Sequence, residues 1–146
     1  MALRNLILKF RMNEKENAKQ FMSRMYEALA DEYKFQGICY RDLCFTLAIL
    51  VGKKLLLEDK LPHIEQIVVS DARTRPLIPV RYNNVRWSTH YVCICNQSAW
   101  DPTLGKPEPV SSYAQKLLGE YLPLLPFWTT EQLKEFNPIK IFVNFD

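Results

Sequence analysis

The sequence predicts a single α+β domain, because two kinds of hydrophobic pattern follow each other along one uninterrupted chain. Apolar residues recur at helical spacing up to about residue 51, and beyond Pro62 they follow the shorter period typical of strands. The 146 residues are 48% hydrophobic, and no internal repeat, linker or low-complexity segment divides them. We therefore expect residues 1–146 to share one hydrophobic core.

The first part of the chain predicts a short strand followed by two helices. Residues 6–12 alternate in a way that suits a strand, and residues 14–34 carry apolar side chains at helical spacing. Gly37 ends this amphipathic helix, and a second helix is expected at residues 39–51. Because the second helix has little charge after Asp42, we expect it to be mostly buried.

The second part predicts mainly strands. One is expected at residues 64–70 and another at 77–82, where Pro79 favours an edge position. Residues 85–95 and 98–103 are expected to form a hairpin. The remaining expected elements are a helix at 111–118, a short helix at 130–136 and a strand at 139–145.

Composition narrows the class of protein. The net charge is +3, and no run of Lys and Arg is dense enough to predict nucleic-acid binding or a membrane patch. The apolar stretch at residues 6–10 contains Lys9 and is too short for a signal sequence or a spanning helix. We therefore expect a cytoplasmic protein whose four cysteines are reduced thiols, and its oligomeric state stays open.

Cys39 is the candidate nucleophile. It stands at the start of the second expected helix, where the helix dipole and the backbone N–H groups stabilise a thiolate and lower the thiol's pKa. A nucleophilic thiol also needs a base, and the chain has two histidines, His63 and His90.

The expected hairpin brings His90 close to a carboxylate. If the chain turns at Asn96-Gln97, Val92 lies opposite Asp101. His90 is then on the same face as Asp101 and diagonal to it. A carboxylate in this place can hold the tautomer of the imidazole and stabilise its cationic form, as in a catalytic triad.

These residues resemble the transglutaminase-like branch of the papain-like cysteine hydrolases. In that branch a Gly-x-Cys segment opens a buried helix and often continues as Arg-Asp plus an apolar residue. Here Gly37-Ile38-Cys39 precedes Arg41-Asp42-Leu43, with Tyr40 as one additional residue. The family then carries a strand histidine and an aspartate commonly followed by Pro-Thr. The chain has His90 and then Trp100-Asp101-Pro102-Thr103.

The resemblance covers residues 35–103 and implies a papain-like core, in which a buried helix carrying the cysteine packs on an antiparallel sheet carrying the histidine and the aspartate. It also implies an acyl-enzyme mechanism on an amide bond of a peptide, a protein or a glutamine-type substrate. Cys39 would attack the carbonyl, His90 would move the proton and Asp101 would orient His90. Water or an amine would complete the transfer, with hydrolysis as the default, and no metal or organic cofactor is implied.

Gln36 and Trp87 are two further residues close to this site in the sequence. Related papain-like enzymes supply an oxyanion donor from a glutamine upstream of the cysteine, which makes Gln36 a candidate beside the backbone N–H of Cys39. The spacing in the family is longer than the three residues found here. Trp87 is predicted to be a core residue, because strand alternation places it on the face opposite His90.

Two other functional classes stay open. One is a structural zinc protein, although no Cys-x-x-Cys knuckle is present. Its ligands would come from Cys39, Cys44, His90, Cys93 and Cys95. The other is a papain-like binding module without turnover, in which basic side chains serve an acidic partner. These side chains are Arg73, Arg75, Arg81 and Arg86.

Overall fold

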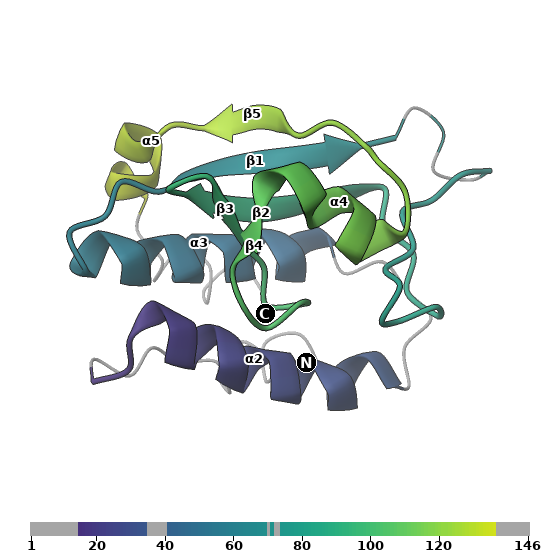
Figure 1. The fold of residues 1–146 in the computed structure, drawn as a ribbon, viewed down its shortest axis with the longest axis horizontal. Helices are drawn as coiled ribbons and strands as arrows, with labels where there is room; N and C mark the ends of the chain where they lie inside the picture. Colours follow the sequence, from purple (N-terminus) through teal and green to yellow (C-terminus); the bar gives the residue numbers. More distant parts are fainter. Residues whose placement is uncertain (1–14, 35–40, 70, 72–73, 137–146) are drawn as a thin grey trace.

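The computed structural model of the chain describes residues 15–34, 41–69, 71 and 74–136, and its first two elements are helices (Figure 1). Helix α2 spans Ala18–Lys34 and helix α3 spans Arg41–Leu57. The helix expected from residue 14 begins later because Asn17 caps it: the N–H of Gln20 donates to Asn17 Oδ1 at 2.8 Å. The expected strands at 6–12 and 139–145 lie outside the described residues.

Helix α3 continues six residues beyond the predicted end at Val51. Gly52, the residue after the predicted end, lies within the helix and faces helix α5, Thr130–Glu135. A Cβ at Gly52 would lie 2.6 Å from Leu133 Cδ2. The glycine is thus explained by the close packing of two helices rather than by a helix end.

Five strands form one antiparallel sheet in the order β4-β3-β2-β1-β5. In chain order the strands are β1 His63–Val68, β2 Thr89–Cys95, β3 Ser98–Trp100, β4 Glu108–Pro109 and β5 Leu125–Trp128. The predicted α+β class and the antiparallel sheet are therefore confirmed. Helix α4, Val110–Leu118, and helix α5 match the expected positions, whereas β4 and β5 were not predicted.

The strand predicted at residues 77–82 is wrong. Only Leu77 pairs there, in an isolated bridge to Trp87, and residues 79–85 form successive turns. The Tyr82 N–H donates to the Pro79 carbonyl at 3.1 Å, and the Val85 N–H donates to the Tyr82 carbonyl at 3.0 Å. These local bonds use the backbone groups that a strand would offer to its neighbours.

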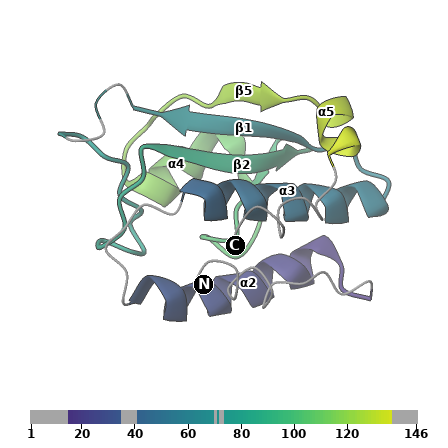
Figure 2. The ribbon, with the colours of Figure 1, turned by 180° about the vertical axis from the view of Figure 1, so that it is seen from behind.

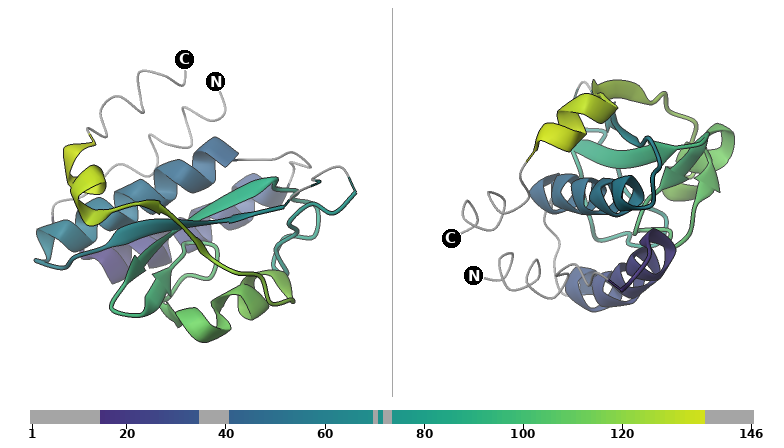
Figure 3. Two further views of the ribbon diagram at one scale, coloured as in Figure 1. Left: turned by 90° about the horizontal axis from the view of Figure 1, so that it is seen from above. Right: turned by 90° about the vertical axis from the view of Figure 1, so that its left-hand side faces the viewer.

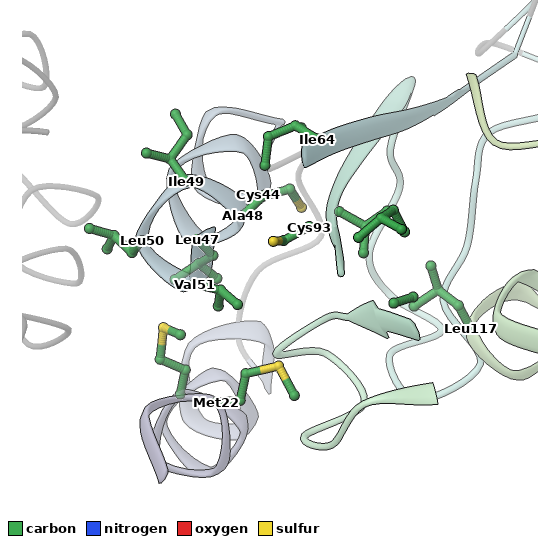
Figure 4. Close-up of a cluster of buried hydrophobic side chains, with 14 of the residues drawn as sticks. Met22, Cys44, Leu47, Ala48, Ile49, Leu50, Val51, Ile64, Cys93 and Leu117 are labelled. Carbon is green, nitrogen blue, oxygen red and sulfur yellow. The ribbon is translucent and has the colours of Figure 1, made fainter. Parts of the chain in front are cut away.

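The sheet lies between α3 on one face and α4 on the other, and α2 packs beside α3 (Figures 2 and 3). Side chains alternate between these faces along β2. Tyr91 packs against Phe45 of α3 with ring centroids 4.9 Å apart and planes tilted by 55°. The sulfurs of Cys93 and Cys44 point toward each other in the core (Figure 4). Among the described residues, no helix is long and apolar enough to cross a membrane.

Candidate active site

His90 and Asp101 meet where strands β2 and β3 form a tight hairpin. Asn96 and Gln97 have φ of 52° and 65°, which gives the two-residue turn that pairs Cys93 with Trp100 in the predicted register. One residue after β3, Asp101 Oδ2 lies 2.7 Å from Nε2 of His90. The side chains of both residues are almost fully buried, at 2% and 3% exposed. The structure thus brings together two of the three predicted site residues.

Asp101 is held as a carboxylate by three donors. The backbone N–H of Thr103 donates to Oδ1 at 2.8 Å, and Oδ2 accepts from the Tyr113 hydroxyl as well as from His90. Burial by itself raises the pKa of the Asp101 carboxyl. The charge of His90 and these hydrogen bonds outweigh burial and bring that pKa below its usual value. Asp101 therefore stays an ionised acceptor inside the protein.

The imidazole of His90 has one nitrogen that is hydrogen-bonded and one that has no hydrogen-bond partner among the described residues. Because the ionised Asp101 can only accept, Nε2 is the nitrogen that carries the proton in the neutral ring. Nδ1 is buried and has no hydrogen-bond partner within the described part of the chain. The lone pair of Nδ1 is then available to take a proton.

Trp87 covers the imidazole ring, contrary to the prediction that it lies on the opposite face. The rings of Trp87 and His90 stack with centroids 4.1 Å apart and planes 16° apart. Strand alternation does not extend to Trp87, because β2 begins only at Thr89, after a bend at Ser88. Trp87 is nevertheless buried, as predicted for a core residue, and its indole shields one face of His90 from water.

The loop that carries Asp101 is anchored to helix α2. Arg81 donates to the carbonyls of Tyr26 and Thr103 at 3.2 and 3.4 Å, and its guanidinium lies over the Tyr26 ring. At Gly105 the loop passes so close to Tyr26 that a Cβ would lie 2.7 Å from ring atoms. These contacts fix the backbone from which Asp101 projects.

Replacing Gly105 by alanine is expected to lower the free energy of unfolding by about 2 kcal/mol or more. The residue has φ of 81°, and the ring its Cβ would meet is held beneath Arg81. Gly119→Ala is the matched control, because its φ is 76° but its nearest contact would be an ordinary 3.4 Å to Val80. Urea unfolding should show only about 1 kcal/mol of loss in the control. Equal losses in the two variants would contradict the close approach to Tyr26.

The other predicted residues fall into two groups. Cys39 and Gln36 lie outside the described residues. Burial raises the pKa of the Cys93 and Cys95 thiols, so both are protonated at neutral pH. Where the structure describes side chains, it contains no group of three or more His, Cys, Asp and Glu placed to hold a metal ion. His63 is a partly exposed strand residue that pairs with Glu65 at 2.5 Å.

His90 lies on the face of the sheet opposite to α3. It alternates with Tyr91 and Cys93, which face α3, and it shares the other face with Tyr113 of α4. However, β3 pairs only with residues 93–95 of β2, so the described chain has no strand beside residues 89–92 on that side. Next to His90, this edge of β2 therefore has no strand partner among the described residues.

Tyr113 is the functional candidate that the sequence reasoning missed. It occupies the buried face of α4, one turn before Leu117, and it is fully buried. A buried tyrosine needs a partner for its hydroxyl, and this rule could have singled it out. The sequence could not name the partner, because that depends on how α4 packs on the sheet.

Comparison with known proteins adds no assignment. The chain matches no family model, no curated protein and no solved structure. The resemblance to the transglutaminase-like branch stays a prediction carried by the residues quoted above.

Proposed function

We propose that the protein is a cysteine-dependent hydrolase or acyl transferase that acts on an amide bond through a thioester. Cys39 is the nucleophile, His90 transfers the proton and Asp101 orients His90. The observation that carries this proposal is the buried His90–Asp101 pair, in which Nε2 is held at 2.7 Å and Nδ1 has no partner among the described residues.

The pair has the properties that a base for a thiol requires. Asp101 fixes which nitrogen of His90 bears the proton, and the ionised carboxylate stabilises the ring when it becomes cationic. A histidine with a purely structural role is expected to use both nitrogens, because a buried polar atom without a partner costs about 1–3 kcal/mol. The absence of a partner for Nδ1 among the described residues supports a role in proton transfer.

The proposed reaction uses these roles in turn. The thiol proton of Cys39 passes to Nδ1 of His90, and the sulfur forms a bond to the substrate carbonyl carbon. The carbon–nitrogen bond of the amide then breaks, and His90 returns the proton to the leaving amine. Water, activated by the same nitrogen, hydrolyses the thioester and releases the acid, unless an amine takes the acyl group instead.

The arrangement of the helices supports access of the cysteine to this nitrogen. Helix α3, which follows Cys39 in the chain, begins at the same end of the molecule as β2 (Figures 1 and 2). His90 is the second residue of β2, on the stretch that β3 leaves unpaired. The proposal requires Cys39 to reach Nδ1 past this stretch of β2, which β3 does not pair with.

The test is the alkylation of the full-length protein with iodoacetamide over a range of pH, read residue by residue by mass spectrometry. At pH 7 the folded protein is expected to react at Cys39 about tenfold faster than the urea-unfolded protein does, because an activated thiol is largely ionised there. Cys39→Ala identifies the reactive position.

The other thiols provide the internal control, since Cys44, Cys93 and Cys95 are buried and should react slowly while the protein is folded. If Cys39 reacts no faster in the folded protein than in the unfolded one, the enzyme assignment fails. A binding module that keeps the His90–Asp101 pair without turnover then becomes the better interpretation.

A further inference from the structure

Tyr113 connects helix α4 to the carboxylate of the proposed catalytic pair. Its side chain is fully buried, and its hydroxyl donates to Oδ2 of Asp101, the same oxygen that faces Nε2 of His90. Burial and the negative charge of Asp101 raise the pKa of the Tyr113 phenol well above its usual value. The phenol therefore keeps its proton and acts as a permanent donor.

We propose that Tyr113 is a positioning residue whose hydroxyl holds the Asp101 carboxylate in the orientation in which Oδ2 faces Nε2 of His90. The inference rests on the proposed function, since the pair that Tyr113 positions is the one assigned there to proton transfer. It extends the site from three residues to four and ties it to α4, an element that carries none of the other three.

Holding the Asp101 carboxylate in one orientation takes a donor to each of its two oxygens. Thr103 N–H holds Oδ1 from the loop that follows Asp101, and it fixes that oxygen alone. The Tyr113 hydroxyl approaches Oδ2 from α4, on a separate element. With both oxygens held from different directions, rotation about the last side-chain bond of Asp101 is restricted, and His90 meets an oxygen already in place.

Several titratable groups face this carboxylate, and each bears on a pH experiment. They are His90 from β2, Tyr113 from α4 and Tyr82 from the turns before β2, while Cys44 of α3 makes a smaller contribution to the raised pKa of Tyr113. Burial is the main cause that raises the pKa of Tyr82 to about 12, with Asp101 as a smaller contribution. At pH below 8 the two tyrosines are neutral, so a titration of Asp101 is read without interference from them.

The experiment compares wild type with Tyr113→Phe, which removes the hydroxyl and keeps the ring. Carbon-13 NMR of the Asp101 carboxyl should show its titration midpoint rise by about one pH unit, because a donor to the charged form is lost. Nitrogen-15 spectra should show that His90 loses part of its preference for the Nε2–H tautomer. His63, the other histidine, serves as the internal reference and should not change.

Tyr91→Phe is the matched control, because it removes a tyrosine hydroxyl from the face of β2 opposite to His90. It should leave both spectra unchanged. If Tyr113→Phe lowers thermal stability but moves neither the Asp101 midpoint nor the His90 tautomer, Tyr113 only packs and the proposal is overturned.

The alkylation of Cys39 separates this proposal from the function on which it rests. A shift of Asp101 together with an unreactive wild-type Cys39 supports the positioning of the carboxylate and rejects the enzyme assignment. A shift of Asp101 together with a slower Cys39 reaction in Tyr113→Phe supports both.

Discussion

Replacing Asp101 by alanine is expected to lower the free energy of unfolding by about 3–5 kcal/mol. The substitution removes the acceptor for three donors at once: His90 Nε2–H, the Tyr113 hydroxyl and the Thr103 N–H. All three lie in a buried site, where water does not replace the lost partner. Urea unfolding followed by circular dichroism measures the change.

A second histidine–carboxylate pair in the same chain provides the matched control. Nε2 of His63 and Oε2 of Glu65 lie 2.5 Å apart, but the side chains of these residues are 39% and 19% exposed. Glu65→Ala should therefore cost less than about 1 kcal/mol, because water screens and replaces the interaction. Similar losses for Asp101→Ala and Glu65→Ala would mean that the buried network contributes nothing beyond an exposed pair.

The same carboxylate makes stability depend on pH in a defined direction. Since the pKa of Asp101 is lowered by folding, its contribution is complete above the usual carboxyl pKa of about 4 and is lost as the pH falls through the lower folded value. Asp101→Asn cannot lose this contribution. Its free energy of unfolding should accordingly fall less than that of wild type between pH 5 and pH 2.

Replacing His90 by glutamine is expected to slow the alkylation of Cys39 about tenfold at pH 7, to the rate of an ordinary thiol. The glutamine amide can still donate to Asp101 from a similar volume, but it cannot take a proton from sulfur. The buried carboxylate therefore keeps a partner, and the variant is expected to fold. Peptide mass spectrometry after timed quenching gives the rate at Cys39.

His63→Gln is the control for this measurement, because it changes the other histidine at a partly exposed position. Its Cys39 should react at the wild-type rate. An unchanged rate in folded His90→Gln would show that His90 does not activate Cys39, and the proton-transfer role would be withdrawn. Circular dichroism establishes that each variant is folded before its rate is compared.

The part of the site that the sequence predicted is the part determined by local geometry. The Asn96-Gln97 turn sets the register of a two-residue hairpin. That register places His90 next to Asp101 through pairing within the hairpin alone. The failed prediction at residues 77–82 has the converse cause. Prolines and turn bonds decided the backbone there, and among the described residues the segment pairs only through the isolated bridge from Leu77 to Trp87.

By itself, the sequence determined the α+β class, the two long helices and the pairing of His90 with Asp101, because these depend on hydrophobic periods and on one tight turn. Only the tertiary structure decided that Trp87 covers the imidazole, that Tyr113 holds the carboxylate and that β3 pairs with residues 93–95 of β2 and not with residues 89–92. Such contacts join elements that are separate in the chain. Their partners are chosen by how helices and loops pack on the sheet, which no local pattern of residues records.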